Sequence, residues 1–277
     1  MLRRIQLGVA MYFRQFLVIA CVMLLSSCED LGSVRGICKK FPELCDDLNK
    51  DGWCRYERAD LIKQRYQVQV SPSGDNKYQL LMHLEDYRDC IERASQIQHS
   101  NNKEQTTQRV NGYLAALAQI EKVSAETEGD TTSDLLYYHW SRHGDKKAHQ
   151  LLLEQDAKGL LERTDMQMRL ASAYSKSEPQ VAVNKLYKAL YLSQGESKYQ
   201  ASIITMLATI FTQQRKNELA YLWMKIGELA EVESIDIEAN SRYLRVNTEQ
   251  RRALDQRAEE IYDTLKEGKF SLPEPKI

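Results

Sequence analysis

The chain has 277 residues, with 38 basic and 39 acidic side chains and a formal net charge of -1. Charges of both signs are mixed along the whole length without a basic stripe or polybasic tail, which argues against nucleic acid as a partner. The length suits one large or two small domains, and five prolines with few alternating β-branched runs favour a mostly α-helical protein.

An apolar run begins at Phe16 and ends in Leu25-Ser26-Ser27-Cys28, preceded by arginines and by no acidic residue. This charge order is typical of a secretory signal. The run is also shorter than the roughly 20 apolar residues that span a bilayer. Leu-Ser-Ser-Cys resembles the lipobox of bacterial lipoproteins, whose cysteine is acylated before cleavage. The resemblance implies a signal peptide over residues 1–27 and a lipid on Cys28.

A cysteine with several acyl chains holds a protein to a membrane without a spanning helix. In the lipoproteins that this motif resembles, Asp directly after the cysteine favours the inner membrane, whereas here the position is Glu29. We therefore expect an outer-membrane lipoprotein that faces the periplasm, with the inner membrane as the alternative.

Four further cysteines follow the lipobox: Cys38, Cys45, Cys54 and Cys90. An even number in an oxidising compartment predicts two disulfides, for which three pairings exist. Zinc is the competing use, but the spacing lacks the Cys-x2-Cys pairs of structural zinc sites. We expect no metal and no other cofactor.

Two helices are predicted at residues 53–70 and 77–98, on either side of the turn-rich stretch 71–76. The second has an apolar stripe with steps of three and four, as expected of one buried helix face. Its members are Leu80, Leu84, Tyr87, Ile91, Ala94 and Ile97. The pattern predicts an antiparallel helical hairpin.

The hairpin narrows the cysteine pairing. Cys54 lies 19 residues before Ser73 at the turn, and Cys90 lies 17 residues after it. The two therefore face each other across an antiparallel hairpin, which predicts a Cys54–Cys90 bridge and leaves a short Cys38–Cys45 bridge. We assign residues 28–100 to a lipid-tethered, cysteine-containing helical region.

The polar stretch 99–104 is a predicted linker to a helical-repeat domain over residues 104–268. Its first helix is predicted to begin near Thr106 or Thr107, which are good N-caps. The apolar stripe of this helix is Val110, Leu114, Leu117 and Ile120.

After Ser133 a pattern of small and large residues occurs three times, with a period of 34 to 38 residues. This period is typical of helix-turn-helix solenoids. The aromatic position holds Trp140, Tyr174 and Phe211, and a small position holds Ala148, Ala182 and Ala220. The third copy resembles a tetratricopeptide repeat, whereas the first two depart from that pattern, for example at Tyr137. Plain antiparallel helix pairs stay open as the alternative.

Residues 235–268 are predicted to end the solenoid with a helix that has one polar face. Residues 269–277, with two prolines, are predicted to form a flexible tail. The expected fold class is thus mostly α, with a disulfide-tied N-terminal hairpin followed by an α-solenoid of tetratricopeptide-like repeats.

In the tetratricopeptide family the first helix of each pair lines the binding groove. The resemblance implies a groove lined by Tyr138, Arg142, Ser172, Lys176, Thr209 and Gln213. A mixed polar lining of this kind favours an extended peptide with a charged group. We therefore expect a lipid-anchored periplasmic scaffold that holds another envelope protein or peptide.

Two patterns point to other chemistry. Asp47-x-Asn49-x-Asp51-Gly52 matches the first half of a calcium-binding EF-hand loop. The twelfth position, however, is Arg58 where a bidentate Glu is needed, so a polar turn is the better interpretation.

His139 and His143 stand four apart on a predicted helix, as metal ligands can. Trp140 occupies the place next to His139 where a metalloprotease has its acid, so half-exposed helix histidines are favoured. No nucleophile elbow and no phosphate loop is present in the sequence. An enzyme is not expected. An envelope enzyme or metal-binding module on the cysteine-tied region, or a structural lipoprotein without a ligand, are the alternatives.

The sequence Cys38-x6-Cys45-x8-Cys54, with Asp51-Gly52-Trp53 inside it, resembles an uncharacterised family of Gram-negative lipoproteins known as a domain of unknown function. The resemblance implies a place in the cell envelope and brings no activity with it.

Overall fold

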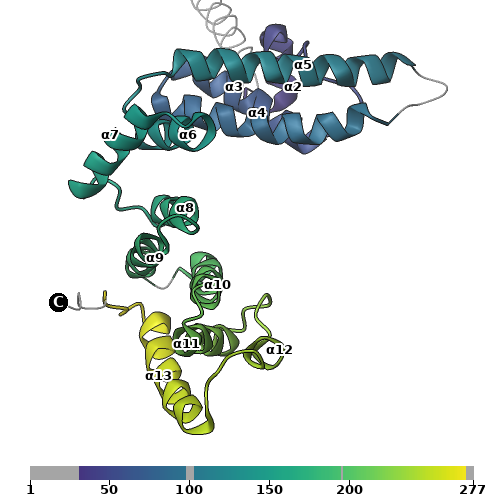
Figure 1. Cartoon of the computed structure of the whole chain (residues 1–277). Coiled ribbons are helices and arrows are strands. Elements are labelled where there is room, and N and C mark those ends of the chain that lie inside the picture. The colour runs from purple at the N-terminus through teal and green to yellow at the C-terminus, as the bar shows by residue number, and fades with distance from the viewer. Residues whose placement is uncertain (1–30, 98–102, 195, 273–277) are drawn as a thin grey trace, which may run out of the picture. The chain divides into compact units, whose positions relative to one another are not determined.

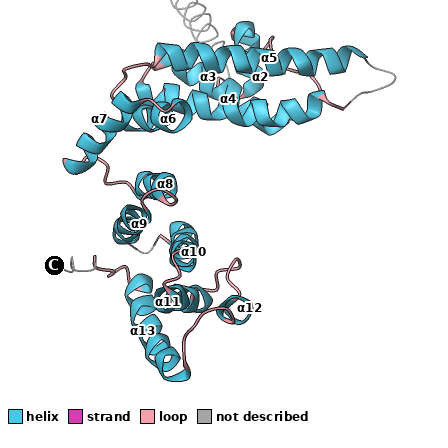
Figure 2. Cartoon of the chain, in the orientation of Figure 1, coloured by secondary structure: helices cyan, strands magenta, loops and turns pink. Residues whose placement is uncertain are grey.

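The structure is a computed structural model that describes residues 31–97, 103–194 and 196–272. All regular elements in these ranges are helices, which confirms the mostly α class (Figure 2). The predicted signal peptide and Cys28 lie outside the described residues. No helix in the described ranges has the length and apolarity to cross a membrane. The chain forms two compact units, one up to Leu135 and one from Leu136 onward.

Unit 1 is a helical hairpin with additional helices packed on it (Figure 1). Its elements are α2 (Val34–Lys40), the 3-10 turn η1 (Pro42–Leu44), α3 (Arg55–Val70), α4 (Gly74–Ser95) and α5 (Lys103–Glu126). Helices α3 and α4 are the predicted hairpin, and the Ser73 side chain caps α4 by accepting a hydrogen bond from the Asn76 N–H. The predicted stripe of α4 is buried except at its last member, Ile97, which lies beyond the helix.

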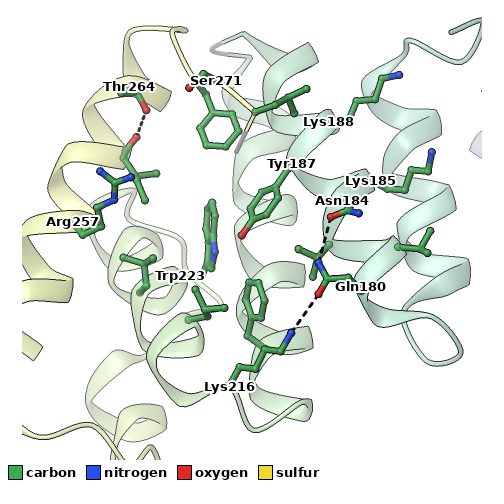
Figure 3. Close-up of a pocket in the computed structure, with 18 of the residues that line it drawn as sticks. Gln180, Asn184, Lys185, Tyr187, Lys188, Lys216, Trp223, Arg257, Thr264 and Ser271 are labelled. Atoms are coloured by element: carbon green, nitrogen blue, oxygen red, sulfur yellow. Dashed lines mark hydrogen bonds between the residues drawn. The ribbon is translucent and has the colours of Figure 1, made fainter. Parts of the chain in front are cut away.

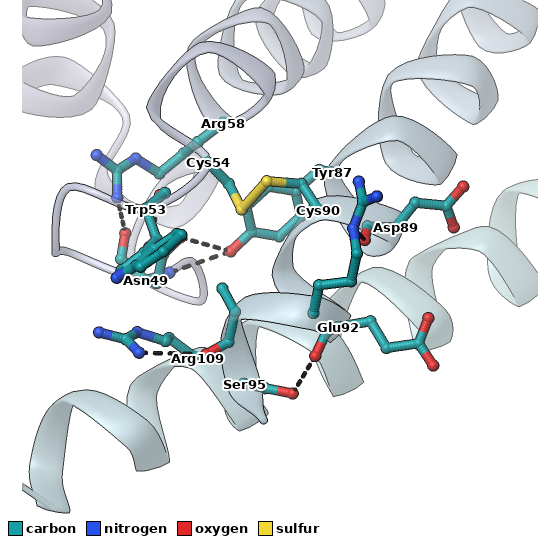
Figure 4. The surroundings of a disulfide bond; sticks show 12 residues. Asn49, Trp53, Cys54, Arg58, Tyr87, Asp89, Cys90, Glu92, Ser95 and Arg109 are labelled. Atoms are coloured by element: carbon teal, nitrogen blue, oxygen red, sulfur yellow. Dashed lines mark hydrogen bonds between the residues drawn. A yellow bond between two sulfur atoms is a disulfide. The ribbon is translucent and has the colours of Figure 1, made fainter. Parts of the chain in front are cut away.

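Both predicted disulfides are present. Cys38 pairs with Cys45, with a Cα–Cα distance of 5.7 Å. Cys54 pairs with Cys90, with a Cα–Cα distance of 5.8 Å (Figure 4). The Cys54–Cys90 bridge joins the N-cap residue of α3 to the second half of α4. The bridge closes a loop with a sequence separation of 36 residues. In the chain-entropy model this constraint on the unfolded chain stabilises the fold by about 4 kcal/mol.

Helix α5 corrects two expectations. It packs against α4 and belongs to unit 1, so the predicted boundary near residue 104 is wrong. Its buried face contains Arg109, Gly112 and Ala116. The predicted apolar stripe of this helix, by contrast, has its first three members exposed to solvent.

The predicted apolar stripe is exposed because the opposite face of α5 packs very closely on the hairpin. A Cβ on Gly112 would lie 2.5 Å from Tyr87 Oη and 3.3 Å from the backbone nitrogen of Asn49. Small residues allow this contact, whereas a face of leucines would hold the helices further apart. The face that contains Gly112 and Ala116 is therefore the one that packs on the hairpin.

Unit 2 consists mainly of successive antiparallel helix pairs. Its elements are α6 (Ser133–His143, which contains the boundary), α7 (Lys146–Ala157), α8 (Thr164–Tyr174), α9 (Pro179–Ser193), α10 (Ser197–Gln213), α11 (Asn217–Leu229), α12 (Ile237–Ser241) and α13 (Thr248–Lys266). Helix α8 pairs with α9 and α10 with α11, while α9 packs on α10 and α11 on α13.

The recurring sequence positions lie in the core of unit 2. Tyr174 and Phe211 are buried, and the rings of Trp140 and Tyr174 have centroids 5.5 Å apart. Ala182 and Ala220 are fully buried at helix contacts. Small residues thus permit close helix packing, and the aromatic residues fill space between successive pairs, as the repeat pattern predicts.

Candidate functional site

A large hollow in unit 2 is the main candidate site (Figure 3). It has a volume of about 1490 Å³ and lies between α9, α11 and α13, with residues 270–272 at one side. The second helix of each pair contributes most of its wall. It is larger than ordinary ligand pockets, whose volumes are roughly 300 to 1,000 Å³.

Aromatic side chains form the inner part of the hollow. The ring of Tyr187 on α9 lies close to those of Trp223 on α11 and Phe270, with centroids 5.9 and 6.4 Å away. Trp223 is only 2% exposed. Burial raises the pKa of the Tyr187 hydroxyl, and the neighbouring Trp223 partly offsets that rise. The inner surface therefore favours an apolar or aromatic group.

Basic side chains surround this aromatic part. Three of them are in ion pairs: Lys185–Asp156, Lys188–Glu162 at 3.3 Å and Arg257–Glu260 at 2.9 Å. Lys216 differs from them, because no acidic residue in the described part of the chain pairs with it. Its ammonium donates a 3.4 Å hydrogen bond to Gln180 Oε1 and lies 5.9 Å from the ring centre of Phe211. Lys216 is therefore a positive charge available to an anionic group.

The Lys185–Asp156 pair is largely buried, with side chains 16% and 20% exposed. Burial acts to raise the pKa of Asp156, but hydrogen bonds from Lys185 and Gln167, with the nearby lysine charges, hold it below its ordinary value. The carboxylate stays ionised and fixes Lys185, which reinforces the contrast with Lys216.

The segment after α13 enters the hollow. Gly268 has a φ of +68°, a left-handed conformation that suits glycine, and it turns the chain out of the helix. The Lys269 N–H then donates to the Thr264 carbonyl at 2.8 Å. Phe270 packs on Tyr187, so the predicted tail 269–277 needs correction for residues 269–272. The remainder of that tail lies outside the described residues.

The six predicted groove residues do not line this hollow. Arg142, Ser172, Thr209 and Gln213 are exposed on the first helices of the pairs, and Lys176 is exposed in the turn after α8. Tyr138 is 2% exposed, because it lies on the same side of α6 as the buried Leu135. The prediction for Tyr138 is therefore wrong, while a role for the other five stays a prediction.

Tyr187 and Trp223 are not among the site residues that the sequence predicted. The available signal was their separation of 36 residues, which falls within the repeat period and marks an aromatic position on consecutive second helices. Nothing in the repeat pattern indicated Phe270, which follows the last helix.

Arginines hold the EF-hand-like loop of unit 1. Both oxygens of Asp47 accept hydrogen bonds of 2.7 Å from Arg65, and Asp51 Oδ2 accepts one of 2.6 Å from Arg109 Nε. Arg58 donates to two backbone carbonyls of the same loop. Guanidinium groups thus occupy oxygens that calcium would need, which favours the polar-turn interpretation.

The same contacts set the ionisation of Asp51. Burial acts to raise its pKa, but hydrogen bonds from Arg109, Asn49 and the Trp53 backbone N–H together lower it below the ordinary value. The carboxylate is therefore held as the anion by positively charged and N–H donors. Asn49 also accepts a hydrogen bond of 2.9 Å from the buried Tyr87 hydroxyl, so the loop is tied to α4 as well.

Two other groupings contain residue types that bind metals. His139 is buried and His143 is exposed, with ring centroids 5.8 Å apart, so the expectation of half-exposure is wrong for both. Cys54, Cys90 and Glu57 have ligand atoms within 4.8 Å of one another. The two sulfurs are bonded to each other and hence are not thiolate ligands.

A family model described as "Protein of unknown function (DUF2989)" matches residues 25–225, most of the chain. This confirms the resemblance to a domain of unknown function, and it neither adds an activity nor bears on lipidation. No curated protein and no solved structure matches the chain.

Proposed function

We propose that this chain, which belongs to the DUF2989 family of proteins of unknown function, is a non-catalytic binding scaffold of the bacterial cell envelope. The observation that carries the proposal is the hollow of unit 2, which combines an aromatic inner surface with a positive charge at Lys216. Its occupant is an extended peptide segment of another envelope protein.

The chain itself indicates which chemistry fits. Residues 269–272 have no regular secondary structure, and Phe270 of this segment packs against Tyr187 within the hollow. An extended segment with an aromatic side chain is therefore compatible with the surface. An acidic group on the same peptide would meet Lys216, since a charged hydrogen bond is among the stronger polar contacts.

The proposal includes the place of the protein. The lipobox resemblance at Cys28 and the cysteines that pair in unit 1 support a lipid-anchored protein in an oxidising compartment, with the outer membrane favoured. The consecutive helix pairs of unit 2 support a tetratricopeptide-like architecture. In that family the groove lies on the first helices, so here the binding face has moved to the second helices.

Site-specific photocrosslinking in living cells tests the binding face. A photoreactive amino acid is placed at Leu219, which lines the hollow and is 36% exposed, or at Thr209, which is exposed on α10. We expect a discrete crosslinked product from Leu219, identified by mass spectrometry, and none from Thr209. The reverse result would move the site to the first-helix face.

Charge reversal tests the chemistry. Purified chain is screened against a random peptide library, and enriched peptides should share an aromatic and an acidic residue. Lys216→Glu should weaken binding of such a peptide about tenfold, which corresponds to the loss of one charged contact. Lys176→Glu is the matched control, because it reverses an exposed lysine in the turn after α8. Equal losses in both variants would contradict recognition by the hollow.

A further inference from the structure

The exposed face of α5 in unit 1 has an apolar stripe with a charged residue at each end. Val110, Leu114 and Leu117 are 39%, 55% and 37% exposed, although they form an apolar stripe at helical spacing. Lys103 and Glu121 extend the same stripe at its two ends, both exposed. Neither has an ion-pair partner among the described residues. The hairpin buries the opposite face of the helix.

The stripe is symmetric about Gly112. Together with Thr107, its six members follow steps of 4, 3, 4, 3 and 4 residues. Val110 and Leu114 are two residues from Gly112 on either side, and Lys103 and Glu121 are nine residues from it. The apolar residues thus lie in the middle, and the two ends have opposite charges.

We propose that α5 is a self-association surface, on which a second copy of this chain binds with its own α5 antiparallel. A twofold axis near Gly112 then places Val110 of each copy beside Leu114 of the other. The same axis brings each Lys103 to the partner's Glu121. Such an interface is isologous, with the same patch on both subunits.

Charge complementarity determines both the occupant and its direction. A parallel pairing would bring Lys103 against Lys103 and Glu121 against Glu121, which is repulsive at both ends. The antiparallel pairing makes both ends attractive, over a seam about 27 Å long at 1.5 Å per residue. Neither a lipid surface nor an unrelated protein accounts for opposite charges placed at equal distances from the middle of the stripe, whereas a second antiparallel copy does.

The contact is expected to be reversible. Three apolar residues on each copy cover less than the roughly 1,200 Å² of a stable interface. Tethering of both copies at one membrane would raise their effective concentration and favour the dimer. The inference concerns unit 1 and does not depend on the hollow of unit 2.

Sedimentation of the detergent-solubilised full chain tests the proposal. We expect a concentration-dependent dimer, which Lys103→Glu or Glu121→Lys alone weakens about tenfold by creating like-charge pairs. The double variant should restore association, because the pairs are then attractive with their signs exchanged. All three changes are on the surface, and circular dichroism checks that the fold is retained.

A crosslinking experiment fixes the direction. Chains with Val110→Cys are mixed with chains with Leu114→Cys under mild oxidation, and a disulfide-linked dimer is expected. Lys122→Cys chains are the control, since Lys122 is exposed but lies off the stripe. A chain that stays monomeric at all concentrations, a double variant no better than the single ones, or a stripe that binds phospholipid vesicles as a monomer would each overturn the proposal.

Discussion

At the scale of single residues, buried arginines organise unit 1. Arg109 is 1% exposed and bonds to Asp51, and it also donates to the Ala94 carbonyl at the end of α4. It therefore joins α5, α4 and the loop before α3. A buried charge is costly unless its partners are complete, so each of these contacts depends on the others.

Arg109→Met, which keeps an unbranched side chain but removes the charge, should strongly destabilise unit 1. Because Asp51 would be left as a largely buried carboxylate without its cation, we expect a loss of about 3 to 5 kcal/mol in the free energy of unfolding. Urea denaturation measures it.

Lys63→Ala is the control, because the Lys63–Asp60 pair is half exposed and such pairs contribute about 1 kcal/mol or less. A similar small effect for Arg109→Met would show that the loop does not depend on this ion pair.

At the scale of elements, α5 shows which features a sequence predicts and which it does not. Counting residues from the turn predicted the Cys54–Cys90 bridge, because an antiparallel hairpin and a covalent bond leave little freedom. The same helical periodicity placed Leu114 in the core, since periodicity identifies an apolar face but not which of two faces is covered. Gly112 determines which face of α5 is buried, because it allows a close approach to Tyr87 on α4.

The hollow was unpredictable for a related reason. Its inner surface needs Tyr187, Trp223 and Phe270 from three separate segments, and their meeting depends on how α13 packs on α11. The sequence predicts a final helix within residues 235–268 but not that Phe270 packs on Tyr187. The predicted groove failed at Tyr138 because the family pattern assigns positions without regard to neighbouring packing.

Gly112→Ala tests the close approach. Alanine normally favours a helix over glycine by up to about 1 kcal/mol. Here its Cβ would meet the buried Tyr87 hydroxyl and the Asn49 backbone, so we expect a net loss of about 1 to 3 kcal/mol in urea unfolding.

Gly52→Ala is the matched substitution, since a Cβ there meets no atom within 4 Å. Stabilisation of the protein by Gly112→Ala would mean that α5 has room to move away from the hairpin.

At the scale of the whole molecule, the two units differ in what stabilises them. All four cysteines of the described disulfides belong to unit 1, and the sequence from Leu136 onward contains no cysteine. Unit 2 depends on its apolar core of paired helices. The redox state of the surroundings should therefore act on one unit only.

Reduction of the disulfides should lower the urea midpoint of unit 1 and leave that of unit 2 unchanged. A thiol reductant removes the loop constraints of unit 1, for which a loss of about 2 to 5 kcal/mol is typical. Tryptophan fluorescence reports each unit, because Trp53 is in unit 1 and Trp140 and Trp223 are in unit 2. In the Trp53→Phe chain, the urea midpoint should be unchanged by reductant. A comparable shift there would indicate that the units unfold as one.

The position of Leu272 has a practical consequence for anyone who produces this protein. Five residues separate Leu272 from a fusion point after Ile277, and a stretch of that length reaches at most about 18 Å. A purification tag or fluorescent protein fused directly after Ile277 would therefore lie close to the hollow of unit 2. There it would compete with the peptide that binds. For interaction screens, the tag should instead be inserted in a surface turn of the protein, such as the turn around Gly129.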